Sequence, residues 1–192
     1  MPIRLIVGLG NPGREHAEQR HNAGFWFADA LADSLSLRFS LESKLNAEVA
    51  RLTGRDEPLW LVKPTTYMNK SGLAVSAVLN YYKIDPADAL IAHDELDLPV
   101  GVARLKFDGG HGGQNGIRDT IAQLGHGKFH RLRIGIGHPG RKELVTPWVL
   151  GRASIADEKL IRTSIANALD VVPMLRAGHI DKATQTLHTP RP

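Results

Sequence analysis

The sequence contains no cysteine, and this absence removes several chemistries at once. Disulfide bonds, thiolate nucleophiles and cysteine-ligated zinc are excluded, and the composition is compatible with a reducing compartment. No apolar run approaches the ~20 residues that a membrane-spanning helix needs. The first residues, Met1 to Arg4, lack the charged-then-apolar pattern of a signal peptide. We therefore expect a cytoplasmic protein without a membrane partner.

Motifs of several familiar catalytic classes are also missing. No G-x-S-x-G elbow is present, which argues against a serine hydrolase of that type. No P-loop is present either. His126 and His130 have the spacing of a metal-binding pair, but Gly127 and the adjoining strand-like segment argue against a helical ligand pair. What the motif segments do contain, one histidine among carboxamide side chains and glycines, suits a hydrolase that activates water with no metal and no covalent nucleophile.

Basic residues are concentrated in one part of the chain. The net charge of the 192 residues is only +4, yet the segment 101–142 contains eight lysines and arginines against two aspartates. A local basic excess beside glycine loops suits a polyphosphate partner. An ordinary solvated basic face is the alternative reading, and composition does not decide between the two.

Strand-like and helix-like segments alternate along the chain. Apolar runs and turn residues predict strands over 3–8, 47–52, 59–62, 89–93, 102–107 and 131–136, the last with one face wet. Helical periodicity predicts helices over 22–35, 71–82, 115–124 and from 154 onward, with a last short helix over 181–187. We expect one domain over 1–192, a three-layer α/β/α fold whose twisted, mixed, mostly parallel central sheet is flanked by helices.

The glycines Gly8, Gly10 and Gly13 follow the first predicted strand in the spacing of the dinucleotide-binding fingerprint. Two features weaken this reading. No acidic residue ends the second strand, and the polar stretch that follows Pro12 separates the turn from the next helix. A nucleotide-binding enzyme that uses this turn remains a rival hypothesis.

One histidine and one aspartate are the candidate catalytic pair. His21 stands at the start of a predicted helix, and Asp94 follows the strand predicted over 89–93. In open α/β sheets, sites gather outside the carboxyl ends of the strands. An aspartate there can accept a hydrogen bond from one imidazole nitrogen and favour protonation of the other. We therefore expect Asp94 within hydrogen-bond reach of His21, against the alternatives of a capping histidine and a turn carboxylate.

Three asparagines, Asn11, Asn69 and Asn115, each lie in a segment that also carries glycine. Asparagine is common at caps and turns, so one of them alone means little. Three together indicate amide groups that grip a peptide backbone or stabilise an oxyanion. Tyr67 and Met68 precede Asn69 in an irregular segment, with core packing as the alternative for Met68.

Six segments in fixed order carry a specific resemblance. They read "VGLGNPG", "RHNAG", "KPTTYMNKSG", "HDELDLP", "GGHGGQNG" and "FHRLRIGIGHPG". From Ile3 to about Gly140 the chain resembles the bacterial-type peptidyl-tRNA hydrolase family. That family hydrolyses the ester between a peptide and the 3′ ribose of tRNA, and its members are monomeric and cofactor-free. The resemblance implies peptidyl-tRNA as the partner, without DNA, and a monomer.

The resemblance also implies roles for individual residues. His21 corresponds to the general base and Asp94 to its supporting carboxylate. Asn11 would select peptidyl over aminoacyl substrates. The remaining side chains at the predicted site would hold the peptide and the activated water: Asn69 and Asn115, beside Tyr67 and Met68.

Further positions concern the tRNA or depart from the family pattern. Lys106 and Arg133 match a basic pair that clamps the 5′ phosphate of tRNA. His16 stands where a tyrosine is usual, at the substrate side of the site. Gln114 replaces a frequent histidine, and its amide does not titrate. A non-catalytic RNA-binding module that uses segment 101–142 is a second rival, which predicts tRNA binding without ester cleavage.

Overall fold

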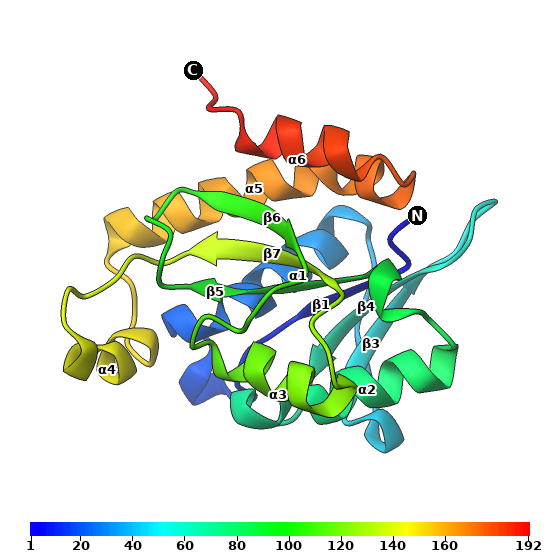
Figure 1. Ribbon diagram of the computed structural model, residues 1–192, viewed down its shortest axis with the longest axis horizontal. Helices are drawn as coiled ribbons and strands as arrows, with labels where there is room; N and C mark the ends of the chain where they lie inside the picture. Colours follow the sequence, from blue (N-terminus) through cyan, green and yellow to red (C-terminus); the bar gives the residue numbers. More distant parts are fainter.

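The computed structural model describes residues 1–192 and is built around a seven-stranded sheet. The strand order is β2-β3-β4-β1-β5-β7-β6, in which β4, β1, β5 and β7 run parallel to one another (Figure 1). On one side β3 pairs antiparallel with β4 and β2 pairs antiparallel with β3, and on the other side β6 pairs antiparallel with β7. The strands are β1 (Leu5–Gly8), β2 (Ser40–Glu42), β3 (Ala47–Leu52), β4 (Leu59–Pro64), β5 (Ala89–Glu95), β6 (Ala103–Phe107) and β7 (His130–Gly135).

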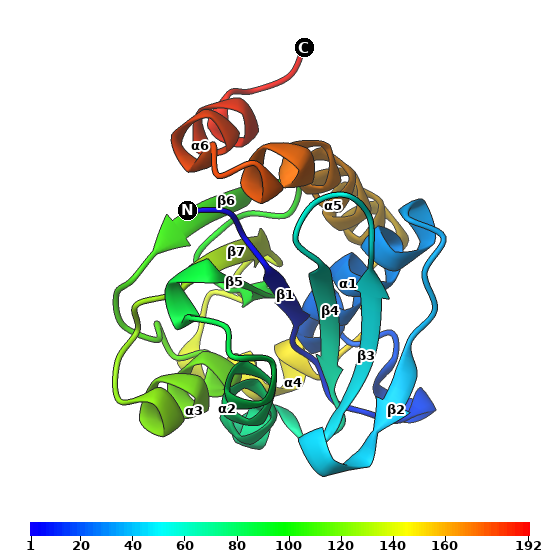
Figure 2. The ribbon, with the colours of Figure 1, turned by 90° about the vertical axis from the view of Figure 1, so that its right-hand side faces the viewer.

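Helices cover both faces of this sheet, as Figure 2 shows, so the predicted three-layer α/β/α fold class is confirmed. The α-helices are α1 (Ala23–Ser34), α2 (Ser71–Tyr82), α3 (Asn115–Leu124), α4 (Val145–Val149), α5 (Ile155–Arg176) and α6 (Ile180–His188). Short 3-10 turns are η1 (Arg14–His16), η2 (Arg20–Asn22), η3 (Ser43–Leu45), η4 (Met68–Lys70), η5 (Pro86–Asp88) and η6 (Lys142–Leu144). None of the helices combines the length and apolar character that crossing a membrane requires.

Two apolar cores hold the layers together. Successive side chains of a strand point to opposite faces, so Ile6 and Leu90 pack toward α1 and α5 while Val7 and Ile91 pack toward α2. Each such side chain stabilises the fold by roughly 1.5–3 kcal/mol when it is fully buried. The central strands are therefore continuous apolar runs, and polar residues collect where these strands end.

Most predicted elements agree with the structure. The helices predicted over 71–82 and 115–124 have those bounds, and the strand predicted over 89–93 continues to Glu95. Neither β2 nor α4 was predicted from the sequence. The prediction of a wet face on 131–136 was wrong for Arg131, which is 3% exposed. The loop that follows β6 folds over the guanidinium of Arg131, which donates hydrogen bonds to the carbonyl oxygens of Asp108, Gly109 and Gly110.

Gly24 determines how closely α1 approaches the sheet. A Cβ atom there would collide with the carbonyl oxygens of Ala92 and Leu9. Gly8 meets the same helix from the sheet side, where a Cβ would collide with the carbonyl oxygen of Gly24. Because all these contacts involve backbone atoms, only glycine lets the start of α1 rest on the ends of β1 and β5. This packing brings η2 to the carboxyl end of β5.

Candidate active site

A cleft of about 350 Å³ opens at the carboxyl ends of β1 and β5. Its lining comes from segments far apart in the sequence, and six of the seven lining residues were predicted for the site from the sequence. The lining residues are Asn11, His21, Tyr67, Met68, Asn69, Asn115 and Leu150. Only Leu150, which directly follows α4, was not anticipated.

His21 and Asp94 form the expected contact. The Nδ1 atom of His21 on η2 lies 2.9 Å from Oδ2 of Asp94 on β5, and the two residues are 7% and 3% exposed. An ionised carboxylate only accepts hydrogen bonds, so Nδ1 carries the proton that is shared with Asp94. The other ring nitrogen, Nε2, has no protein partner and belongs to a ring that lines the cleft. Neutral His21 therefore presents a lone pair to the cleft.

Two opposing effects act on the pKa of His21. Desolvation by burial lowers the pKa, because it disfavours the charged imidazolium. The negative charge of Asp94 and its hydrogen bond raise the pKa, and together they outweigh burial. The net result is a pKa above the usual value, so the imidazole is a stronger base than free histidine.

Gln114 occupies the other oxygen of Asp94. Its Nε2 atom donates to Asp94 Oδ1 over 3.0 Å and lies 3.3 Å from the sulfur of Met68. Its Oε1 atom accepts from the backbone N–H of Ile117 over 2.8 Å, which caps the N-terminus of α3. In the sequence, Gln114 is distinguished only as a departure from a family pattern. Its place directly before a helix was the available signal, because such positions favour side chains that cap the helix.

Asn11 is held rigidly at the floor of the cleft. Its Oδ1 accepts from the backbone N–H of Met68 over 2.7 Å. Its backbone is clamped by Asn22, whose side chain accepts from the Asn11 N–H over 2.8 Å and donates to the Asn11 carbonyl over 2.9 Å. The Asn11 oxygen is therefore occupied, and its NH₂ group is the part left for a ligand. Asn22 lies in the "RHNAG" segment, but no pattern along the chain pairs it with Asn11.

Polar and aromatic side chains form the rim of the cleft. Tyr67, Asn69 and Asn115 are exposed, whereas Met68 is buried, so the core-packing alternative describes part of its role. His16 does not line the cleft. Its ring stands edge-on to that of Tyr67, with the centroids 6.1 Å apart, so it supports the rim from outside.

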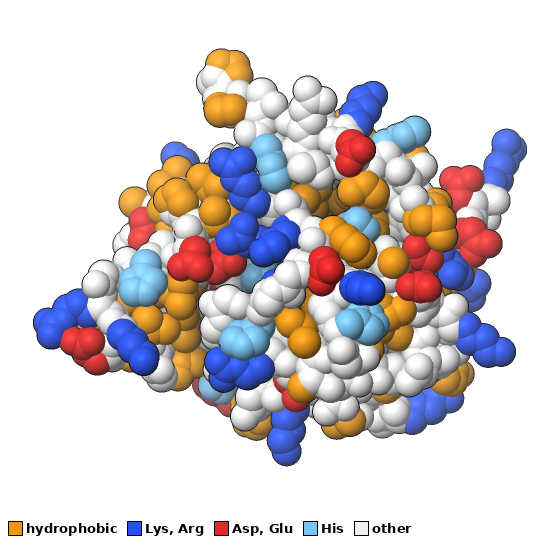
Figure 3. Space-filling view, in the orientation of Figure 1, with side chains coloured by type: hydrophobic (Ala, Val, Ile, Leu, Met, Phe, Trp, Pro, Cys, Tyr) orange, Lys and Arg blue, Asp and Glu red, His pale blue; other side chains and the backbone are white.

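Lys106 and Arg133 lie on the neighbouring strands β6 and β7, outside the cleft. Pairing of these strands puts Arg104, Lys106, Arg131 and Arg133 on one sheet face, since the residues between them pack into the core on the other side. Figure 3 shows Lys and Arg side chains gathered over this part of the molecule. Arg133 is already paired, with its Nε 2.9 Å from Glu95 Oε1, while Lys106 is exposed and has no ion pair. Arg133 therefore already has a carboxylate partner, whereas Lys106 has none.

Arg20 fixes α4 beside the cleft, another contact that the sequence did not indicate. Its guanidinium stacks on the ring of Trp148, 3.5 Å from the centroid, and donates to the Trp148 carbonyl over 3.0 Å. Its backbone N–H donates to the carbonyl of Gly151 over 3.0 Å. These contacts hold the segment with Leu150 against η2, where Leu150 completes the apolar side of the cleft.

The glycine turn after β1 does not form a phosphate cradle. Helix α1 begins only at Ala23, after η1 and η2, so no long-helix N-terminus faces the turn. Gly10 packs against the ring of Phe25, where a Cβ would lie 2.6 Å from the nearest ring atom. Gly8 and Gly10 therefore serve the packing of the strand and its turn against α1, which argues against the nucleotide-binding rival.

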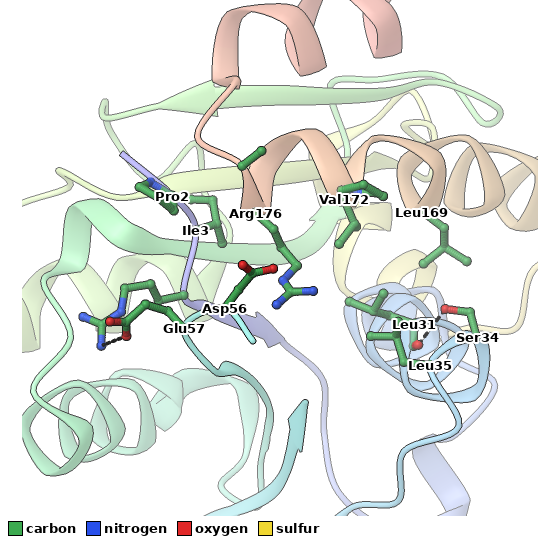
Figure 4. A pocket seen from close by; sticks show the side chains of 13 residues that line it. Pro2, Ile3, Leu31, Ser34, Leu35, Asp56, Glu57, Leu169, Val172 and Arg176 are labelled. Atoms are coloured by element: carbon green, nitrogen blue, oxygen red, sulfur yellow. Dashed lines mark hydrogen bonds and ion pairs between the residues drawn. The ribbon is translucent and has the colours of Figure 1, made fainter. Parts of the chain in front are cut away.

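A larger cavity, of about 690 Å³, lies near the start of β1 and contains none of the predicted site residues (Figure 4). Its wall is formed by the ends of α1 and α5, including Leu31, Leu35 and Val172, and by the turn that carries Glu57. The larger cavity is therefore not the place where the candidate catalytic residues lie. No group of three or more His, Asp or Glu side chains is arranged to hold a metal ion.

Comparison with known proteins shows the family to which this chain belongs. The family model for peptidyl-tRNA hydrolase matches residues 5–192. A peptidyl-tRNA hydrolase from Xanthomonas oryzae pv. oryzae is 59% identical over 189 residues, which are 98% of this chain and 97% of the relative. One from Stenotrophomonas maltophilia is 58% identical over 189 residues, 98% of each chain. The crystal structure of peptidyl-tRNA hydrolase from Acinetobacter baumannii matches with a TM-score of 0.95 at 46% identity, covering 98% of this chain and 96% of that one. This chain is therefore a hydrolase that belongs to the peptidyl-tRNA hydrolase family.

Proposed function

We propose that this protein hydrolyses the ester bond between the peptide and the 3′ ribose of peptidyl-tRNA, with His21 as general base and Asp94 as its support. The observation that carries the proposal is the 2.9 Å contact between His21 and Asp94 in a cleft lined by Asn11, Asn69 and Asn115. The comparisons support the substrate class, because the matched relatives are peptidyl-tRNA hydrolases.

The first step is the activation of water. The Nε2 lone pair of His21 takes a proton from a water molecule as its oxygen attacks the ester carbonyl carbon. Asp94 stabilises the imidazolium that forms, since its carboxylate holds the Nδ1 proton over 2.9 Å. Burial lowers the pKa of His21, but this carboxylate outweighs burial and raises it, so proton transfer from water is favoured.

The second step is the collapse of the tetrahedral intermediate. Its oxyanion needs donors, which carboxamide groups or backbone N–H groups at the start of α3 supply. The bond between the carbonyl carbon and the ribose O3′ then breaks, and the proton on His21 passes to that oxygen. A ribose hydroxyl is a better leaving group than an amine, so no covalent acyl-enzyme is required.

The tRNA moiety would contact the basic face of β6 and β7. Of the two predicted phosphate ligands, Lys106 is exposed and has no ion pair, and Arg133 lies on the same sheet face but is paired with Glu95. Phosphate contacts of this kind bind RNA without reading its sequence. We further propose that the protein acts as a monomer in the cytoplasm, where peptidyl-tRNA is formed.

Parallel incubation with N-acetyl-aminoacyl-tRNA and unblocked aminoacyl-tRNA tests this function. We expect cleavage of the blocked substrate only. His21→Ala should nearly abolish turnover while thermal stability and tRNA binding persist, and the exposed His179→Ala serves as the matched control. Full activity of His21→Ala would refute the mechanism. Binding of tRNA by the parent protein without any cleavage would favour the RNA-binding module.

A further inference from the structure

Resting on the proposed function, we propose that Gln114 is a positioning residue of the His21–Asp94 pair. Its side-chain amide, oriented by the cap of α3, donates to Asp94 and turns the opposite carboxylate oxygen toward His21. Gln114 does not touch the reacting atoms; it acts through Asp94.

The polarity of this hydrogen-bond chain is determined at its far end. The backbone N–H of Ile117 can only donate, so the Gln114 atom 2.8 Å away must be the oxygen Oε1. The NH₂ group of Gln114 is then forced to face Asp94, 3.0 Å from Oδ1. Asp94 accepts from Gln114 at one oxygen and from His21 at the other, and this arrangement leaves Nε2 of His21 unprotonated.

A buried carboxylate needs such a second donor. Asp94 is 3% exposed, and a carboxylate held in a low-dielectric site is stable as an anion only when its oxygens are satisfied. The titratable and charged side chains on the elements that meet here are Arg20 and His21 on η2, His93 and Glu95 on β5, Arg131 and Arg133 on β7, Lys70 on η4, and Arg118 and Asp119 on α3, with Tyr67 and His111 in the adjoining loops.

The same side chain ties the catalytic pair to the helix that carries Asn115. Gln114 caps α3, whose first residue, Asn115, lines the cleft. Its amide also lies 3.3 Å from the Met68 sulfur, which lines the cleft from the other side. One residue therefore fixes the separation between the proton acceptor and the peptide-binding asparagine.

Two substitutions separate positioning from helix capping. Gln114→Asn keeps a good capping group but is one methylene too short to reach Asp94. We expect it to lower kcat roughly tenfold, the effect of losing one hydrogen bond to a charged group, with little change in KM. Gln114→Glu keeps the capping oxygen and replaces only the donor.

Gln114→Glu should give a distinctive pH profile. While the introduced carboxyl group is protonated, it can still donate to Asp94. Once ionised it would face a second carboxylate, so kcat should fall as pH rises while parent kcat does not. A capping role alone predicts no such fall, since a negative charge at a helix N-terminus is favourable. The exposed Gln123→Glu on the same helix is the matched control and should keep the parent profile.

Reversing the direction of the hydrogen bonds among Gln114, residue 94 and His21 provides the decisive measurement. In Asp94→Asn, Gln114 holds the asparagine oxygen, so the new NH₂ group faces His21 and opposes its Nδ1 proton. In Asp94→Asn combined with Gln114→Glu, the carboxylate accepts from that NH₂ group and turns the asparagine oxygen back toward His21. We expect the double variant to be at least tenfold more active than Asp94→Asn near neutral pH.

The proposal would be overturned if the double variant is no more active than Asp94→Asn, or if Gln114→Glu follows the parent pH profile. Nitrogen NMR of His21 reports the ring tautomer independently of turnover. We expect the proton on Nδ1 in the parent and the double variant, and on Nε2 in Asp94→Asn. These spectra distinguish a failure of this proposal from a failure of the proposed function, which is tested by His21→Ala.

Discussion

Replacement of Asp94 by Asn should change the chemistry of His21 without changing the shape of the site. Gln114 Nε2 donates to Asp94 Oδ1 over 3.0 Å, so an asparagine in that place will turn its own oxygen to Gln114. Its NH₂ group then faces Nδ1 of His21, 2.9 Å from the position of Oδ2. Neutral His21 must accept there, which moves its proton to Nε2 and blocks proton transfer from water.

The expected loss can be bounded. Removing a hydrogen bond to a charged group costs about 1.5–3 kcal/mol, which corresponds to roughly ten- to 150-fold in rate. Inversion of the tautomer adds to this, and the comparable aspartate-to-asparagine change in a serine-protease triad lowers kcat ~10⁴-fold. We therefore expect kcat of Asp94→Asn to fall by at least roughly tenfold and by as much as ~10⁴-fold.

The pH dependence of the same variant supplies an independent check. In the parent, kcat/KM should rise with pH as His21 loses its proton, with a midpoint above the usual histidine pKa, because the lowering effect of burial is outweighed by Asp94. Without the carboxylate, burial alone acts, so the pKa of His21 and the acid limb should move to lower pH. Single-turnover cleavage of N-acetyl-aminoacyl-tRNA at several pH values measures both quantities. A rate within threefold of the parent, or an unmoved acid limb, would refute the reasoning.

Three further outcomes follow from the packing and the charges. Gly24→Ala should lower stability by about 1–3 kcal/mol and reduce kcat, because α1 must retreat from the backbone of the sheet; thermal unfolding and turnover measure these effects. Lys106→Ala should weaken tRNA binding and lower its salt slope by about one, whereas Arg133→Ala should also destabilise the fold by leaving Glu95 unpaired; binding titrations in increasing salt separate them. Burial lowers the pKa of His93, so below about pH 6.5 the unfolded chain binds a proton at this residue that the folded chain does not bind. The free energy of unfolding should therefore fall toward acid pH. Urea unfolding at several pH values should show a less steep fall in His93→Gln.

The sequence was informative where local patterns determine structure. Helices 71–82 and 115–124 could be bounded because apolar periodicity and glycine or asparagine punctuation agree along each segment. The place of Asp94 was also predictable, because parallel strands bring their carboxyl ends to one edge of the sheet, where sites gather; His21 reaches this edge through the docking of η2. What made this possible is a rule of topology that does not depend on side-chain detail.

The remaining features depend on contacts between distant segments. Gln114 and Asp94 are twenty residues apart, and the partner of each is decided by how α3 docks on the sheet. Arg131 resembles a solvated basic residue in sequence, yet its burial depends on a glycine loop that wraps around its guanidinium. Asn22 clamps Asn11 only because the 3-10 turn η2 folds back on the loop after β1. A pattern of residue types along the chain does not encode these pairings.

The clamped amide of Asn11 makes a prediction about substrate choice. Its oxygen is committed to the Met68 N–H at 2.7 Å, so only its NH₂ group is free to meet a ligand. An NH₂ donor can bind the carbonyl oxygen of a blocked α-amino group, but it repels the ammonium group of a free aminoacyl ester. We therefore expect this arrangement to favour N-blocked substrates by its donor polarity.

Asn11→Asp should weaken this preference while keeping the clamp. One carboxylate oxygen would still accept from Met68, and the other would present a negative charge that repels a carbonyl oxygen and attracts an ammonium group. We expect the ratio of kcat/KM for N-acetyl-aminoacyl-tRNA over aminoacyl-tRNA to fall by roughly tenfold or more, the effect of exchanging one favourable hydrogen bond for a repulsive contact. Asn80→Asp, an exposed change on α2, is the matched control. An unchanged ratio in Asn11→Asp would mean that the selectivity arises elsewhere in the cleft.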